Sequence, residues 1–167
     1  MITAPELLNE SHDVSSFHCS RIILNEWLSK RAKKANHLGG SARTYVICSD
    51  NKKVIGYYSL ATGSINHTDV SGKVKRNMPD PIPVIILGRL AIDYDYSGRG
   101  LGQGLLRDAL LRVTVAAKLI GVRAVWVHAL DDDAKRFYQR HGFYESPTNE
   151  KTLMLTVAEI VREIGSK

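Results

Sequence analysis

A glycine-rich turn at residues 94–108 (YSGRGLGQGLLRDAL) separates a strongly apolar run from a leucine-rich run. Glycine is costly inside a helix whereas leucine favours one, so we expect a helix from about Leu101 to Leu119. The preceding run at residues 84–93 (VIILGRLAID) is apolar at nearly every position, which is typical of a strand buried on both faces. A second apolar run follows the helix at residues 123–129 (RAVWVHA). This strand–helix–strand order predicts an α/β fold.

The rest of the chain fits the same fold class. Residues 14–35 carry apolar side chains at mostly three- and four-residue spacing, which predicts an amphipathic helix with a basic polar face. Residues 43–49 and 54–65 are rich in β-branched and aromatic residues and are expected to form a hairpin. A proline-containing loop, a short helix, a strand and a closing helix follow at residues 67–83, 131–142, 152–157 and 158–165. A chain of 167 residues without an internal linker predicts one domain, residues 1–167.

Composition argues against several classes of protein. No apolar run approaches the ~20 residues that a membrane-spanning helix needs, and the charged N-terminal residues lack the apolar core of an export signal. Cys19 and Cys48 belong to no CxxC motif or Cys/His cluster, which argues against a disulfide scaffold and against a metal site. We therefore expect a cytoplasmic protein with reduced thiols, no metal and no membrane association.

The net charge of +6 is unevenly distributed along the chain. Residues 21–43 hold six basic side chains against Glu26 alone, and Lys73, Lys75 and Arg76 form a second basic cluster. Such a segment suits a phosphate backbone, because each neutralised phosphate releases counterions. A solvated, lysine-rich helix face is the alternative that the sequence leaves open.

The glycine-rich turn is suited to binding an anion. Glycine lets a phosphate approach backbone N–H groups, and the N-terminus of a helix attracts negative charge. The turn contains no Gly-Lys-Ser/Thr and is therefore not a P-loop, and its glycine spacing does not give the G-x-G-x-x-G of a dinucleotide-binding fold. It contains R-x-x-G-x-G instead, at residues 99–104.

This R-x-x-G-x-G, the upstream LGRLAID and the downstream VHALDDDAKRFYQRHGF resemble, in this order, the coenzyme-binding motifs of the GNAT family of N-acetyltransferases. The resemblance implies a single GNAT domain, a mixed central sheet flanked by helices, and acetyl-coenzyme A as the acetyl donor. It also implies that the turn binds the pyrophosphate and that the strand before it pairs with the pantetheine arm and polarises the thioester carbonyl. The coenzyme-binding residues expected on this basis are Leu90, Ala91, Ile92, Arg99, Gly100, Leu101, Gly102, Gln103, Gly104 and Phe137.

Acetyl transfer from a thioester to an amine requires a proton for the departing thiolate. Tyr138 is the predicted donor, because a phenol with a pKa near ~10 keeps its proton at neutral pH. The resemblance places this tyrosine beside the thioester sulfur. Packing of the helix on the sheet is the alternative role for Phe137 and Tyr138, and for Phe137 it is preferred. His128 is a candidate base, although a structural role suits it better, and the acidic run 131–133 is expected to cap a helix.

The N-terminal part of the chain points to the acceptor. Residues 17–50 and 54–65 resemble the N-terminal portion of the GNAT toxins of bacterial toxin–antitoxin pairs, the group that acetylates aminoacyl-tRNA. This resemblance implies a bacterial toxin that acetylates the α-amino group of aminoacyl-tRNA and blocks translation. It also implies a ribbon-helix-helix antitoxin as partner and a homodimer. The expected tRNA contacts are Lys30, Lys33, Lys34, Arg43, Arg76 and Arg89.

The chemistry agrees with such an acceptor. The α-amino group of an aminoacyl ester has a pKa at or below the ~8 of an ordinary α-amine, so it needs no strong general base. Two alternatives remain open. One is a GNAT enzyme that acts on a protein N-terminus, a lysine or a small amine. The other is a non-catalytic module that binds the coenzyme and RNA, against which Tyr138 and the intact R-x-x-G-x-G count.

Overall fold

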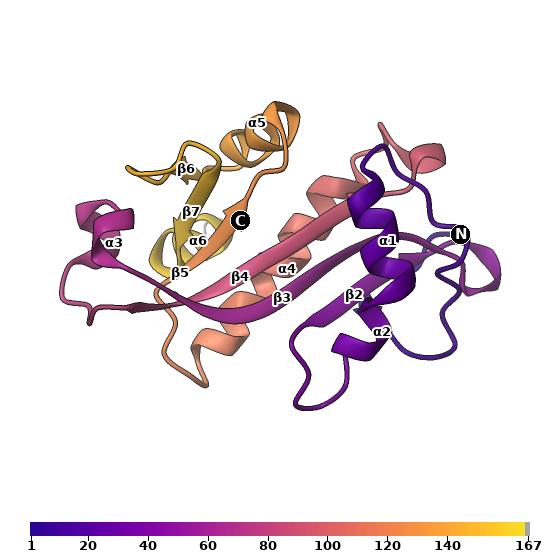
Figure 1. Cartoon of the computed structure of the whole chain (residues 1–167), viewed down its shortest axis with the longest axis horizontal. Coiled ribbons are helices and arrows are strands. Elements are labelled where there is room, and N and C mark those ends of the chain that lie inside the picture. Colours follow the sequence, from indigo (N-terminus) through magenta and orange to yellow (C-terminus); the bar gives the residue numbers. More distant parts are fainter. Residues whose placement is uncertain (166–167) are drawn as a thin grey trace. The chain divides into compact units, whose positions relative to one another are not determined.

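The structure, a computed structural model, describes residues 1–165 (Figure 1). Its strands are β1 (Glu6–Leu7), β2 (Arg43–Cys48), β3 (Val54–Ile65), β4 (Ile82–Ile92), β5 (Ala124–His128), β6 (Tyr144–Glu145) and β7 (Thr152–Thr156). Its helices are α1 (Ile22–Lys30), α2 (Ala32–Ala35), α3 (Gly72–Lys75), α4 (Leu101–Ala117), α5 (Asp132–Arg140) and α6 (Val157–Gly165). None of the helices within residues 1–165 is long and apolar enough to cross a membrane.

The strands form a mixed sheet, which confirms the α/β class. The strand order is β1-β2-β3-β4-β5-β7-β6 in a seven-stranded sheet. β4 and β5 run parallel, whereas the pairs β1–β2, β2–β3, β5–β7 and β6–β7 are antiparallel. A parallel pair requires a crossover connection, which α4 supplies between β4 and β5.

The chain divides into two compact units. The first unit comprises Met1–Ala61 and Gly88–Ala109, and the second comprises Thr62–Leu87 and the chain from Leu110 onward. β3, β4 and α4 each contribute residues to both units. That residues 1–167 make up one domain stays a prediction.

In the first unit, β2 and β3 form the hairpin that the sequence predicts, and β1 pairs with the other edge of β2. α1 and α2 lie over this hairpin (Figure 1), and their buried apolar side chains share one core with it. The shared core includes Leu24, Leu28 and Ala32 from the helices and Val46, Val54 and Tyr57 from the strands. The three- and four-residue spacing of the helical residues is therefore explained by burial against the sheet.

The helix predicted over residues 14–35 is shorter than expected. The side chain of Asn25 binds the backbone of Cys19 from both sides, with Cys19 N to Asn25 Oδ1 at 2.8 Å and Asn25 Nδ2 to Cys19 O at 3.1 Å. These bonds replace helical ones, so α1 begins only at Ile22. At Arg31 the backbone leaves the helical region, with φ −127° and ψ −28°, so α1 ends at Lys30 and α2 begins separately.

Two further expectations need correction. β4 is buried on both faces only in its first half, since the neighbouring Val84 and Ile85 are both buried whereas Gly88 is exposed and Arg89 half-buried. The helix that follows begins at Leu101, as predicted, but ends at Ala117 rather than Leu119. The environment of β4 therefore changes at Gly88.

In the second unit, β5 pairs with Val84–Leu87 of β4 and with β7. The predicted loop over residues 67–83 contains the short helix α3, which the sequence did not indicate. The guanidinium of Arg123 donates to the carbonyls of Val74 and Lys73, both at 2.9 Å. Because these bonds join residues far apart in the chain, no local pattern predicts the helix that they hold.

Replacing Leu28 by Ala is expected to lower the free energy of unfolding by about 2–5 kcal/mol. Leu28 is 1 % exposed, and its loss leaves a cavity between α1 and the hairpin. Ile22→Ala is the matched control on the same helix, since Ile22 is 69 % exposed. It should change stability by no more than about 0.5 kcal/mol in denaturant unfolding. Equal losses for both variants would contradict the packing of α1.

Candidate active site

The glycine-rich turn lies in the first unit, between the end of β4 and the start of α4. Gly98 and Gly100 both have a φ of +76°, a left-handed conformation that other residues rarely adopt. A side chain at either position would meet open space, so backbone conformation rather than crowding requires glycine there. Asp93 opens the turn, with its Oδ1 accepting the backbone N–H of Asp95 at 3.0 Å.

The start of α4 offers backbone donors to an anion. The helix begins at Leu101, so the N–H groups of Leu101, Gly102 and Gln103 have no acceptor within the helix. The Gly104 N–H is already used, since it donates to Gly100 O at 3.3 Å. Arg99 is exposed beside these donors, with its guanidinium carbon 4.9 Å from the centre of the Tyr96 ring. This arrangement suits a phosphate.

Leu90, Ala91 and Ile92 form the last residues of β4, directly before the turn. The strand end is anchored to β3, because Asp93 N donates to Ile55 O at 2.8 Å. The first unit therefore contains the predicted coenzyme-binding residues of the strand and of the turn. Phe137, the remaining one, belongs to the second unit.

Helix α5 in the second unit carries Phe137 and Tyr138. Tyr138 is 7 % exposed, and its ring lies 5.2 Å from that of Phe137 and 5.4 Å from that of Phe143. The turn after α5 brings Phe143 back, with Phe143 N donating to Tyr138 O at 3.1 Å. Both aromatic residues therefore belong to one aromatic cluster with Phe143. Their packing of the helix on the sheet and proton donation by Tyr138 stay predictions.

The polar residues near α5 have structural roles. Asp131 caps the helix, as predicted, with its Oδ1 accepting from Ala134 N at 2.9 Å. Gly142 ends it with a φ of +94°. His128 is exposed, and its Nδ1 lies 3.5 Å from Thr152 Oγ1. The contact is consistent with a hydrogen-bonded structural histidine.

Three of the predicted tRNA contacts lie around Trp27. Lys30 and Lys34 line a pocket of about 460 Å³ together with Trp27, Arg31, Ala35 and Ser41. The guanidinium carbon of Arg89 lies 4.0 Å from the centre of the Trp27 ring. Burial lowers the pKa of Arg89 below its ordinary value. The structure thus joins residues of α1 and α2 with a residue of β4.

The other predicted contacts lie elsewhere. Lys33 holds the N-terminal segment, since its ammonium donates to His12 O at 2.9 Å and to Glu10 O at 3.4 Å. Arg43 donates to its neighbour's carbonyl, Ala42 O, at 3.3 Å. Arg76 belongs to the second unit. None of the three lines the pocket at Trp27.

Arg31 is a basic residue of the pocket that was not among the predicted contacts. Positions 27, 30, 31 and 34 have the spacing of one helix face, and this periodicity could have indicated the cluster.

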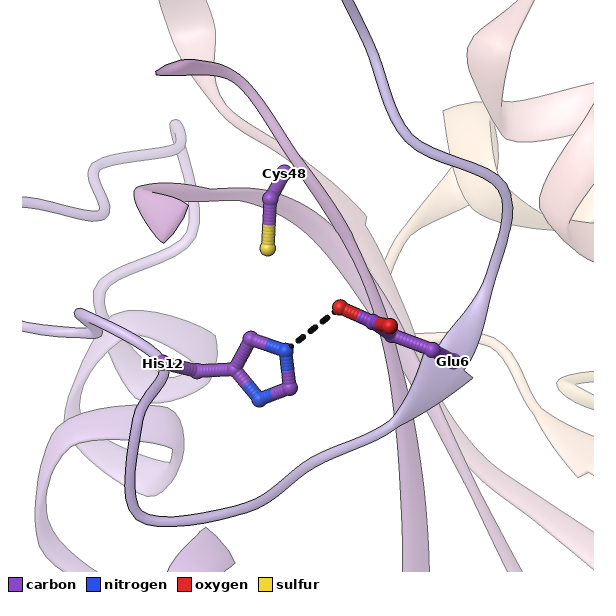
Figure 2. A group of neighbouring side chains, drawn as sticks. All are labelled: Glu6, His12 and Cys48. Atoms are coloured by element: carbon purple, nitrogen blue, oxygen red, sulfur yellow. Dashed lines mark hydrogen bonds and ion pairs between the residues drawn. The ribbon is translucent and has the colours of Figure 1, made fainter. Parts of the chain in front are cut away.

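Glu6, His12 and Cys48 lie together in the first unit, with ligand atoms within 4.8 Å of one another (Figure 2). The Nδ1 of His12 accepts the backbone N–H of Asn9 at 2.9 Å, so a neutral imidazole carries its proton on Nε2. That proton points to Glu6 Oε1, 2.7 Å away. A metal ion would need the lone pair of this nitrogen. The geometry therefore favours hydrogen bonds that hold the N-terminal segment in place over a metal site.

Fold and site define the class of protein. The chain matches the acetyltransferase (GNAT) domain family over residues 41–145, more than half of its length. It therefore belongs to the GNAT family of acetyltransferases. Among individual proteins, it is 48% identical over 163 residues to the tRNA-acetylating toxin of Mycobacterium tuberculosis (strain ATCC 25618 / H37Rv). This match covers 98% of the present chain and 97% of that protein.

Solved structures are similar over the full chain. The structure of AtaT complexed with acetyl-methionyl-tRNAfMet has a TM-score of 0.86 and 28% sequence identity, covering 99% of this chain and 98% of that chain. A tyrosine-to-phenylalanine mutant of the AtaT toxin, bound to the C-terminus of the antitoxin AtaR and acetyl-CoA, has a TM-score of 0.82 and 27% identity. It covers 99% of both chains.

Replacing Lys33 by Gln is expected to lower the free energy of unfolding by about 1–3 kcal/mol, since the carbonyls of Glu10 and His12 lose a charged donor. Lys34→Gln is the matched control, because Lys34 is exposed and belongs to the pocket instead. Its effect should stay within about 0.5 kcal/mol. Urea unfolding compares the two. A larger loss of unfolding free energy for Lys34→Gln would show that Lys33 does not hold the N-terminal segment.

Proposed function

We propose that this protein is a bacterial toxin that transfers an acetyl group from acetyl-coenzyme A to the α-amino group of aminoacyl-tRNA. The observation that carries the proposal is the 48% identity to a tRNA-acetylating toxin over 98% of the chain. A solved relative that is similar over 99% of the chain is complexed with an acetylated aminoacyl-tRNA. An acetylated amino group can no longer form a peptide bond, so the reaction blocks translation.

The first unit supplies the residues for the donor. The N–H groups at the start of α4 are suited to the pyrophosphate, with Gly100 giving the backbone its left-handed turn and Arg99 adding positive charge. The end of β4 at Leu90–Ile92 is proposed to pair with the pantetheine arm and to polarise the thioester carbonyl. In support, the AtaT relative is bound to acetyl-CoA.

In the proposed reaction, the unprotonated α-amine attacks the thioester carbonyl carbon and forms the new C–N bond. The C–S bond then breaks, and the amine's proton passes to solvent. Tyr138 donates its phenolic proton to the departing thiolate and regains one from solvent afterwards. Its position between Phe137 and Phe143 restricts the ring, which favours a directed hydroxyl over a mobile one.

For the acceptor, Lys30, Lys34, Arg43, Arg76 and Arg89 are proposed to contact the tRNA. Lys33, which the sequence groups with them, is assigned to the N-terminal segment, since its ammonium already binds two carbonyls. Phosphate contacts of this kind give affinity without sequence preference. They explain how the enzyme holds tRNA, and other contacts decide which tRNA is chosen.

The partners follow the same reasoning. We propose a ribbon-helix-helix antitoxin, a homodimer and a cytoplasmic location, with residues 1–167 as one GNAT domain. Support for an antitoxin comes from the AtaT relative, which is bound to the C-terminus of the antitoxin AtaR.

Transfer of labelled acetyl groups tests the proposal. The protein is incubated with acetyl-labelled acetyl-coenzyme A and either aminoacyl-tRNA or deacylated tRNA, in the presence of a peptide with a free N-terminus. We expect label on the aminoacyl moiety and none on deacylated tRNA. Label on the peptide would indicate a protein acetyltransferase, and label on neither acceptor would indicate a non-catalytic module. Either result would overturn the assignment.

Tyr138→Phe is expected to lower kcat by about 10²–10⁴-fold, the usual contribution of a general acid, with little change in KM for acetyl-coenzyme A. Tyr144→Phe is the control, because it also removes a tyrosine hydroxyl, one bonded to Glu159 Oε1 at 2.8 Å, outside the proposed coenzyme site. Steady-state rates of both variants decide the point. Unchanged turnover in Tyr138→Phe would exclude its role as the proton donor.

A further inference from the structure

Two adjacent tyrosines of β3 connect the sheet of the first unit to two different helices. Tyr57 and Tyr58 are both 0 % exposed, and successive side chains of a strand point to opposite faces. The hydroxyl of Tyr57 donates to Leu24 O in α1 at 2.7 Å. The hydroxyl of Tyr58 donates to Asp108 Oδ2 in α4 at 2.5 Å, within the range of hydroxyl–carboxylate bonds. Each tyrosine therefore holds a different helix against the sheet.

The ring of Tyr58 is itself held in place. Tyr45 lies directly opposite it in β2, and the two rings stack with their centres 5.3 Å apart and their planes at 22°. Cross-strand aromatic pairs of this kind stabilise a sheet. Because the ring is buried and stacked, its hydroxyl offers Asp108 a fixed point of attachment.

The start of α4 needs such an attachment, because its first turn has few side chains to pack. Gly102 and Gly104 carry none, and a Cβ at Gly104 would have no atom within 4 Å. The turn before the helix contains Gly98 and Gly100, and glycine has the most conformational freedom of any residue. The turn and the first helical residues therefore do not fix the direction of α4 by themselves.

Apolar packing holds the next part of α4 but does not fix its direction either. Leu105, Leu106 and Ala109 are buried. The hydrophobic effect is non-directional, whereas a hydrogen bond requires a particular distance and angle. The bond between Tyr58 and Asp108 therefore specifies the rotation of α4 against β3 more narrowly than the packing of its leucines does.

The position of Asp108 determines where the first N–H groups of α4 point. Asp108 follows Leu101 by about two helical turns, or ~10 Å, on the same face of the helix. We propose that Tyr58, acting through Asp108, is a positioning residue for the coenzyme, because its hydroxyl fixes the N–H groups of Leu101, Gly102 and Gln103. This inference rests on the proposed function, in which these groups bind the pyrophosphate.

The effect of this bond falls on the affinity for the coenzyme. Backbone donors bind a phosphate only at hydrogen-bond distance, so a small shift of the helix end weakens several bonds together. Tyr138, the proposed proton donor, belongs to the other unit, so the chemical step is expected to change little.

Tyr58→Phe removes the hydroxyl and keeps the ring. Calorimetric titration with acetyl-coenzyme A alone should give a Kd about tenfold higher than in the unaltered protein, the scale of one hydrogen bond to a charged group. In steady-state assays, KM for acetyl-coenzyme A should rise by the same factor while kcat changes by less than about twofold.

Tyr57→Phe is the matched control, because it removes a hydroxyl from the neighbouring residue of the same strand, equally buried and also hydrogen-bonded. It should lower the urea midpoint of unfolding about as much as Tyr58→Phe does and leave the Kd for acetyl-coenzyme A unchanged. A purely structural role for Tyr58 would give two variants that differ neither in stability nor in coenzyme affinity.

Two substitutions of Asp108 provide a second comparison, which also decides the point if Tyr58→Phe does not fold. Asp108→Asn and Asp108→Leu remove the same charge, but only the asparagine keeps an oxygen that accepts the Tyr58 hydroxyl. Asp108→Leu should therefore raise the Kd for acetyl-coenzyme A about tenfold relative to Asp108→Asn.

Three results would overturn the positioning role. They are parental coenzyme affinity in Tyr58→Phe, equal losses of affinity in Tyr57→Phe and Tyr58→Phe, and equal affinity in the two Asp108 variants. The titrations need no acceptor, and acetyl transfer to aminoacyl-tRNA by the unaltered protein is measured separately. If transfer persists while the titrations fail, the positioning role is wrong and the proposed function stands.

Discussion

The carboxylate of Asp93 joins the functional features of the first unit. Asp93 is 2 % exposed, and its oxygens accept from Asp95 N in the glycine-rich turn and from His18 N before α1, both at 3.0 Å. Its own N–H donates to Ile55 O at 2.8 Å, which ties the same residue to β3. Hydrogen bonds from N–H groups to a carboxylate are stronger than those between neutral groups. One buried side chain therefore sets where the turn leaves the sheet and where the chain enters α1.

The two regions of this unit that are proposed to bind ligands are both positioned by Asp93. Tyr94 N donates to His18 O at 2.7 Å, so the turn and the segment before α1 are also joined through their backbones. α1 then places Trp27 on Tyr57, and the turn places the first N–H groups of α4 beside Gly100. Without the buried carboxylate, both His18 N and Asp95 N would lose their acceptor at the junction.

The sequence predicted what depends on local periodicity and local caps. Neighbouring residues determine three features that the structure confirms. These are the hairpin of β2 and β3, the start of α4 at Leu101 and the Asp131 cap of α5. The helix over residues 14–35 was predicted too long, because the bonds of Asn25 to Cys19 and the bond of His18 N to Asp93, 75 residues away, hold the segment before Ile22 out of the helix. Lys33 and Lys34 are neighbouring lysines that the sequence cannot tell apart. They differ in the folded chain, because the ammonium of Lys33 donates to the carbonyls of Glu10 and His12.

The residues proposed to bind the donor and those proposed to bind the acceptor meet in adjacent parts of β4. The donor is proposed to be bound by backbone groups of Leu90–Ile92 and of the turn. The spacing of the glycines in the sequence predicted the turn. The proposed acceptor contacts around Trp27 depend on side chains from α1 and α2 and on Arg89, which meet only after folding. Because Arg89 directly precedes Leu90 in β4, the strand fixes its guanidinium relative to the backbone that the coenzyme is proposed to bind. Exchanging these side chains would change the affinity for the proposed acceptor and leave the turn unchanged, which is why the turn indicates the donor alone.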